Sequence, residues 1–163
     1  IRVSAGLPRR PLGRTGMTPS LLGLGTVKLG RRTGVRYPRP FDLPDDAAAA
    51  ALLDQARELG IDLLDTAPAY GRSEERLGRL LRGRREDFLL VTKCGERFDG
   101  HRSSFDFSAE HTTASVHASL RRLRTDRLDC VLLHSHGDDA ALLADGAALD
   151  ALARLKRAGA VRS

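Results

Sequence analysis

The sequence reads DFLLVTK from residue 87 to residue 93, a short and nearly continuous apolar run that ends on a lysine. Similar runs occur at three other places: LLGLGTV at 21–27, IDLLD at 61–65 and LDCVLLH at 128–134. Short runs that are apolar at almost every position are typical of parallel strands buried on both faces of a sheet. The runs therefore predict four such strands.

The amphipathic segments between these runs predict helices. The first follows Pro44 and stops at Gly60. Its Leu52, Ala56 and Leu59 are spaced i, i+4, i+7, which predicts one buried stripe. Further helices are expected to open at Ser73, which would be the N-cap, and at Ser108, and to cover about 147–158. Strands that alternate with helices imply right-handed crossovers and a parallel sheet.

Two architectures have this alternation, an open doubly wound sheet and a closed barrel. In GLGTVK, Lys28 stands where the dinucleotide-binding fingerprint of the open sheet requires its third glycine. We therefore expect an α/β fold of the (β/α)8 TIM-barrel type. Such a barrel needs about 250 residues, so 163 residues hold only about the first four β/α units. The chain is then either part of a longer protein or a half-barrel that pairs with something else.

Composition excludes several classes of protein. The net charge is +6, but the arginines that supply it are scattered and form no stripe with interleaved aromatic residues, so no nucleic-acid partner is expected. No run of about 18 apolar residues suggests a membrane span. Cys94 and Cys130 are too few for a disulfide framework. Two reduced thiols and no secretory signal predict a cytoplasmic protein.

Polar side chains stand at the ends of successive predicted strands. Asp65 ends the second strand and Tyr70 follows it, while Lys93 ends the third strand and His134 the fourth. Each has an ordinary alternative, such as a helix cap, a rim tyrosine or a satisfied core histidine. Because the carboxyl ends of parallel strands open at one mouth, we expect these side chains to converge.

The converging groups suit proton donation to a carbonyl oxygen. A tyrosine is a poor acid at neutral pH unless a neighbouring charge tunes it. Protonated Lys93 beside Tyr70 would favour loss of the phenolic proton, and Asp65 would hold Lys93 in place. His134 could orient and polarise the carbonyl as a neutral donor. This general-acid site contains no nucleophile and no obvious metal, so it needs a hydride from a cofactor.

Four motifs resemble, in order, the signatures of the aldo-keto reductases: GLGT (23–26), LLDTAPAYGRSEERLG (63–78), LVTKCG (90–95) and LDCVLLHSH (128–136). In addition, PLGRTGMTPSLLGLGT (11–26) resembles the hairpin that closes the bottom of the barrel in that family. The resemblance implies one barrel domain whose N-terminal half is residues 1–163. Its parts would be a hairpin at about 9–20, β/α units at about 21–158 and the start of strand five at 160–163.

The same resemblance implies NADPH-dependent reduction of an aldehyde or ketone, a small-molecule substrate, to an alcohol. It gives Asp65, Tyr70, Lys93 and His134 the catalytic roles, with Tyr70 as proton donor. It places Gly25, Thr26 and Asp65 near the cofactor. The family's main cofactor contacts follow strands five to eight, so the expected preference for NADPH (NADP+) over NADH rests on the resemblance alone.

The loops after the strands suggest how a substrate is held. Most of the aromatic residues lie there, where apolar side chains commonly line a pocket. We expect a substrate rim made of Tyr37, Phe41, Phe98, Phe105 and Phe107. The first long loop also carries Arg31, Arg32, Arg36 and Arg39, which would either favour an anionic substrate or form a solvated surface. Substrate identity and oligomeric state are left open by these residues.

Two other functions remain possible on the sequence alone. His134 and His136 lie on one face of an extended segment, as in metal-dependent barrel hydrolases, and Asp65 and Glu96 could add carboxylates. However, the His-x-His pair of those hydrolases usually follows the first strand, whereas this pair follows the fourth. The second alternative is a non-catalytic barrel subunit or an inactive fragment.

Overall fold

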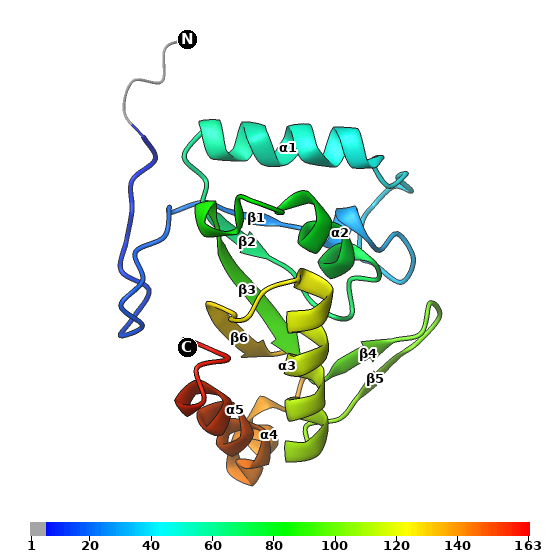
Figure 1. Ribbon diagram of the computed structural model, residues 1–163. Coiled ribbons are helices and arrows are strands. Elements are labelled where there is room, and N and C mark those ends of the chain that lie inside the picture. Colours follow the sequence, from blue (N-terminus) through cyan, green and yellow to red (C-terminus); the bar gives the residue numbers. More distant parts are fainter. Residues whose placement is uncertain (1–5) are drawn as a thin grey trace.

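The structure, a computed structural model, describes residues 6–163. One parallel sheet has the strand order β1, β2, β3, β6 (Figure 1). The strands are β1 (Gly23–Gly25), β2 (Leu63–Asp65), β3 (Leu89–Cys94) and β6 (Cys130–Leu133). Each apolar run of the sequence supplies one of these strands. Because strands that are consecutive in the sheet are joined through helices, the arrangement is that of the first part of a (β/α)8 barrel.

Helices connect the strands and pack against the sheet (Figure 1). They are α1 (Asp46–Glu58), α2 (Ser73–Leu80), α3 (Ala109–Leu123), α4 (Asp139–Asp145) and α5 (Ala147–Arg157), with short 3-10 helices at η1 (Val27–Leu29) and η2 (Arg85–Asp87). Side-chain oxygens cap α1 and α3: Asp45 accepts from the amide of Ala48, and Ser108 from that of His111. These bonds satisfy amides that the helix itself leaves free at its first turn.

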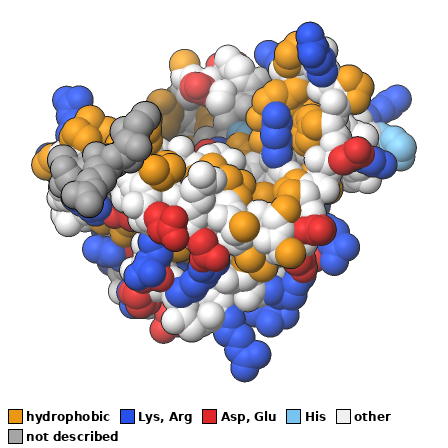
Figure 2. All heavy atoms as spheres, turned by 90° about the horizontal axis from the view of Figure 1, so that it is seen from above, with side chains coloured by type: hydrophobic (Ala, Val, Ile, Leu, Met, Phe, Trp, Pro, Cys, Tyr) orange, Lys and Arg blue, Asp and Glu red, His pale blue; other side chains and the backbone are white. Residues whose placement is uncertain are grey.

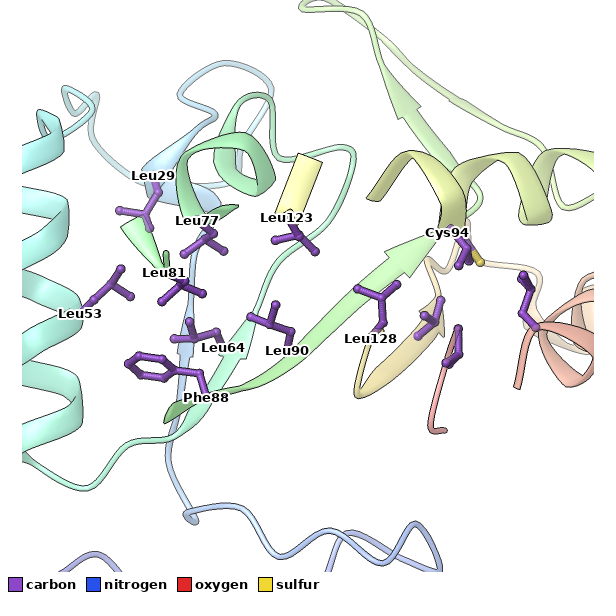
Figure 3. Packing of buried hydrophobic residues seen from close by; sticks show 14 of the residues in the cluster. Leu29, Leu53, Leu64, Leu77, Leu81, Phe88, Leu90, Cys94, Leu123 and Leu128 are labelled. Atoms are coloured by element: carbon purple, nitrogen blue, oxygen red, sulfur yellow. The ribbon is translucent and has the colours of Figure 1, made fainter. Parts of the chain in front are cut away.

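The main core lies between the sheet and the helices. Figure 3 shows Leu64 of β2 and Leu90 of β3 among Leu53 of α1, Leu77 of α2 and Leu123 of α3. These leucines are almost completely buried. Burying a leucine side chain contributes about 1.5–3 kcal/mol, so this layer holds the strands in register and fixes where their carboxyl ends lie.

The buried stripe of α1 differs from the prediction. Leu52 and Leu59 are 38% and 46% exposed, and the buried residues are Ala49, Leu53 and Ala56. This stripe has the same i, i+4, i+7 spacing, begins three residues earlier and shares Ala56 with the predicted one. The run of alanines and leucines in α1 offers two overlapping stripes, and packing against the sheet selects the one that carries Leu53.

The opposite face of the sheet meets the N-terminal segment. This segment turns back on itself through an antiparallel bridge between Arg9 and Ser20. It brings Met17 against Val91 and Cys130, which form a second, smaller apolar cluster. The segment therefore packs at the end of the sheet away from the predicted catalytic residues.

The loops after β3 and β6 contain more structure than the sequence predicted. Strands β4 (Glu96–Phe98) and β5 (Ser103–Phe105) form an antiparallel hairpin directly after β3. The segment after β6 contains α4, which ends at Gly146 in a left-handed conformation. At the C-terminal side, Val161 pairs in parallel with Leu128 through an isolated bridge.

Charged side chains are spread over the surface. On the face in Figure 2, lysines and arginines lie among acidic and apolar side chains and do not gather in one stripe. Within residues 6–163, no helix has the length and apolar character needed to cross a membrane.

Candidate active site

Lys93 and Asp65 form the centre of the site. They lie near the carboxyl ends of the adjacent strands β3 and β2, where Asp65 is in register with Val91. The Lys93 ammonium donates to both carboxylate oxygens of Asp65 and, at 3.0 Å, to the carbonyl oxygen of Thr66. These acceptors fix the lysine ammonium in position.

Tyr70 and His134 complete the predicted set. Tyr70 lies in the loop between β2 and α2, and its ring centroid is 4.7 Å from Lys93 Nζ. The His134 ring meets the Tyr70 ring edge to face, with 5.9 Å between centroids. The structure therefore brings together all four side chains that the strand ends predicted: Asp65, Tyr70, Lys93 and His134.

The predicted cofactor contacts have different surroundings. The Thr26 hydroxyl is fully buried and donates to the carbonyl oxygen of Asp65 at 2.9 Å. It also accepts a hydrogen bond from Ser73 Oγ at 2.9 Å, so Ser73 uses its side chain here and does not cap α2 as predicted. Gly25, in contrast, has no atom within 4 Å of the place where a Cβ would stand. Of this pair, Gly25 is the residue that leaves open surface beside Asp65.

Two further charged residues contact the site. Glu96, at the start of β4, places its Oε2 atom 2.9 Å from Nδ1 of His134. The other carboxylate oxygen of Glu96 lies 3.3 Å from Nη1 of Arg31. The sequence marked Glu96 only as a possible metal ligand and Arg31 as a possible anion contact or surface residue. Both side chains are about 10% exposed, and Glu96 lies between Arg31 and His134.

Burial sets the charge state of the histidine. It lowers the pKa of His134 below its ordinary value, and the ammonium of Lys93 lowers it further. The carboxylates of Glu96 and Asp65 act in the opposite direction and do not cancel the shift. The neutral imidazole is therefore the main form of His134 near neutral pH.

A pocket of about 630 Å³ opens at these residues. Tyr70, His134 and Glu96 line it together with Tyr37 from the loop before α1. A pocket of about 640 Å³ lies between the β4–β5 hairpin and α3, but neither Tyr70 nor His134 lines it. We therefore place the candidate site in the former pocket, where the carboxyl ends of the strands open.

The predicted rim residues separate into groups. Tyr37 lines the pocket and packs edge to face on Phe41, with Lys28 Nζ 4.2 Å from the Tyr37 ring centroid. Phe98 lies beneath the guanidinium of Arg31, 3.4 Å from its central carbon. Tyr37 is thus the rim residue that shares the pocket with Tyr70.

Phe105 and Phe107 pack elsewhere: they stack on each other with 6.3 Å between ring centroids, and both meet the ring of His136. The His136 ring centroid is 5.7 Å from that of Phe105 and 5.2 Å from that of Phe107. Its Nδ1 accepts a hydrogen bond from the amide of Asp138. His136 is therefore held in an aromatic cluster, and residues 6–163 contain no group of three or more histidine, cysteine or acidic side chains arranged to hold a metal ion.

Comparison with known proteins agrees with this geometry. Residues 21–163 match the family model described as "Aldo/keto reductase family". The chain belongs to the aldo/keto reductase family. The predicted fold is thereby confirmed: the parallel sheet is the first part of the family's barrel, and the family consists of oxidoreductases.

Among curated relatives, this aldo/keto reductase is 36% identical to L-galactose dehydrogenase of Arabidopsis thaliana over 160 residues, which are 94% of this chain and 46% of the relative. It is 34% identical to the NADH-specific methylglyoxal reductase of Escherichia coli over 137 residues, which are 76% of this chain and 40% of the relative. The chain therefore spans less than half the length of these relatives.

Solved structures of aldo-keto reductases have the same fold. One from Pseudomonas aeruginosa superimposes with a TM-score of 0.87 at 54% identity, over 95% of this chain and 57% of that one. Another, the holo form of an enzyme from Bacillus halodurans, gives a TM-score of 0.76 at 32% identity, over 96% of this chain and 48% of that one. The chain thus corresponds to about half of each structure.

Proposed function

We propose that the protein reduces an aldehyde or ketone to an alcohol with NADPH, and that Tyr70 donates the proton. The observation that carries the proposal is the placement of the Lys93 ammonium, paired with Asp65 and 4.7 Å from the Tyr70 ring centroid. A fixed positive charge beside a phenol favours its ionised form, so it helps Tyr70 release a proton as the carbonyl oxygen gains negative charge. Asp65 and Lys93 are positioned to hold this arrangement.

The residues present suit a nicotinamide cofactor. Gly25 leaves open space beside Asp65 on the strand next to β2, where a flat ring can approach the backbone. The cofactor, when bound, supplies the hydride to the carbonyl carbon. Tyr70 supplies the proton to the carbonyl oxygen, and the pocket shared with His134 and Tyr37 admits a small substrate.

The proposal also covers the layout of the whole barrel. Residues 1–163 would be the N-terminal half of a single barrel domain, with a hairpin at about 9–20, β/α units at about 21–158 and strand five starting at 160–163. The cofactor would be NADPH, although one relative is described as NADH-specific. Such an enzyme would work in the cytoplasm with its two buried thiols reduced.

The test is Tyr70→Phe, measured as cofactor oxidation with a panel of aldehydes and ketones. Loss of general acid catalysis should lower kcat about 100- to 10,000-fold. Cofactor binding, followed by fluorescence, should stay unchanged because the phenyl ring is kept. Tyr37→Phe is the matched control in the same pocket and should keep most of the turnover.

Turnover by Tyr70→Phe at the wild-type rate would remove Tyr70 as proton donor. Absence of turnover by the wild-type protein with both NADPH and NADH would favour a non-catalytic subunit. Comparing kcat/KM for the two cofactors tests the preference for NADPH directly.

A further inference from the structure

The carboxylate of Glu96 is held at the centre of a buried polar group. Its side chain is only 10% exposed. One oxygen accepts a hydrogen bond from Ser103 Oγ at 2.6 Å and one from Arg31 Nη1 at 3.3 Å, and the other oxygen faces His134. A buried carboxylate is costly unless charges and hydrogen bonds surround it. The hydrogen bonds from Ser103 and Arg31 therefore also fix the position of the Glu96 charge relative to His134.

Arg31 anchors this carboxylate to the loop that carries Tyr70. Its guanidinium donates to the carbonyl oxygen of Ala69, the residue before Tyr70, at 3.0 Å. It also donates to the carbonyl oxygens of Thr33 and Gly34 at 3.0 and 2.9 Å. Arg31 also lines the pocket, but these bonds and the one to Glu96 engage all three nitrogens of its guanidinium. Arg31 thereby connects the loop before α1, the Tyr70 loop and the β4–β5 hairpin.

The contact between Glu96 and His134 determines where the imidazole carries its proton. Nδ1 of His134 is buried and 2.9 Å from Oε2 of Glu96, although out of line for a hydrogen bond. A nitrogen lone pair and a carboxylate oxygen repel each other at that distance, whereas an N–H attracts the carboxylate. Since Nδ1 is buried and His134 nevertheless lines the pocket, the imidazole reaches the pocket by its other edge, which carries Nε2.

We propose that Glu96 is a positioning residue that keeps a proton on Nδ1 of His134 and directs Nε2 into the pocket beside Tyr70, with Arg31 as its anchor. The neutral imidazole then offers Nε2 as an acceptor, in contrast to the neutral donor expected from the sequence, and Nε2 donates to a carbonyl oxygen only when the ring takes a second proton. The adjacent carboxylate stabilises that second proton. The catalytic consequence rests on the proposed reductase function, but the position of the proton does not.

The charged and titratable groups around His134 come from every neighbouring element. They are Glu96 on β4, Lys93 on β3, Asp65 on β2, Arg31 after η1 and Tyr70 in the loop before α2. Lys93 and Arg31 disfavour the imidazolium, and Glu96 is the charge that favours it most. Removing the Glu96 charge should therefore lower the pKa of His134 further.

The experiment is nitrogen NMR of the full chain with isotopically labelled histidine, with His134 assigned by loss of its signals in His134→Asn. Above the ordinary histidine pKa of 6.5, the wild type should carry its proton on Nδ1. In Glu96→Gln the neutral ring should lose this preference, and its pKa should fall by about 1–3 units. Glu96→Asp keeps the charge one methylene farther away and should give an intermediate pKa, which also covers the case that Glu96→Gln does not fold.

Glu86→Gln is the matched control, because Glu86 is 74% exposed and pairs with Arg127 at the surface. It should leave the His134 signals unchanged. A proton on Nε2 in the wild type, or an unchanged tautomer and pKa in both Glu96 variants, would overturn the proposal. Neither outcome depends on whether the protein reduces carbonyl compounds.

Kinetics then test the consequence for catalysis. Glu96→Gln should lower kcat about 10- to 100-fold, the cost that is typical when the group orienting a metal-bound histidine is removed. The KM for cofactor should stay unchanged, and Glu96→Asp should recover part of kcat. A loss confined to stability, with normal kcat in the folded protein, would contradict a positioning role. If the wild type shows no turnover, the reductase proposal fails while the NMR result still decides the role of Glu96.

Discussion

Gly30 gives the sharpest test of how the Tyr70 loop is placed. Its φ of −143° suits any residue, so backbone preference does not require glycine here. Space does: a Cβ on Gly30 would lie 2.1 Å from the amide nitrogen of Ser73 and 2.2 Å from the carbonyl oxygen of Tyr70. Both are backbone atoms, which cannot rotate away as the end of a flexible side chain can. Gly30→Ala must therefore displace the loop that carries Tyr70.

The size of the displacement sets the expected effect. Real Cβ atoms essentially never approach another heavy atom more closely than 3.0 Å, so the loop must move by about 1 Å. A shift of about 1 Å in a catalytic group can cost about 100-fold in rate. Overpacking of this kind destabilises a protein by about 1–3 kcal/mol. We expect Gly30→Ala to show both losses, measured as kcat/KM for carbonyl reduction and as the free energy of unfolding in urea.

Gly78→Ala separates the two losses. A Cβ on Gly78 would lie 2.1 Å from the carbonyl oxygen of Arg122, an equally severe clash where α2 meets α3. This variant should lose comparable stability and keep its kcat/KM. Gly25→Ala, with nothing within 4 Å of its Cβ, should keep its stability. If Gly30→Ala has the free energy of unfolding and the kcat/KM of the wild type, the predicted clash with the Tyr70 loop is refuted.

Three further predictions follow from buried polar groups. Glu74 is 1% exposed and paired with Arg122, so Glu74→Ala should lower the free energy of unfolding, measured in urea, by about 3 kcal/mol. Burial lowers the pKa of His134 and His111 below 6.5, so their neutral forms stabilise the fold fully above pH 6.5 and lose this contribution as the pH falls through the lowered pKa values. Thermal melts should show Tm falling over that range, and a constant Tm would contradict it. Burial raises the pKa of Cys94 to about 11, so a thiol reagent at about pH 8 should modify it only in denaturant.

The regular part of the fold could be predicted because burial leaves a signal in the sequence. Each strand of the main sheet lies in an apolar run of the sequence, and a polar residue of the site lies at or next to the carboxyl end of β2, β3 and β6. The β4–β5 hairpin was missed because its second strand is not buried: Ser103–Phe105 are exposed throughout. An exposed hairpin shows no alternation of apolar and polar residues, so nothing in the pattern separates it from a loop.

The contacts of Glu96 and Arg31 with each other and with His134 were missed for a different reason. Glu96 and Arg31 lie 65 positions apart in the sequence, and no local pattern links them. In a chain with so many arginines, a buried one has no local mark that distinguishes it from the exposed Arg32 beside it. One signal was available: Glu96 follows a strand that ends at the predicted site, as the other polar residues of the site do.

The use of lysine in place of arginine pointed to the candidate site more directly than the net charge did. The chain carries 27 basic residues, of which only Lys28, Lys93 and Lys156 are lysines. At the place of Lys93, the cation must fit between the Asp65 carboxylate and a backbone carbonyl in a side chain that is only 12% exposed. A compact ammonium suits this confined position, whereas a planar guanidinium needs partners spread over a wider area. Arg31 illustrates the second case, because its donors reach three different carbonyl oxygens and a carboxylate. The two cations thus have different positions: Lys93 lies beside the phenol of Tyr70, and Arg31 joins the loops around it.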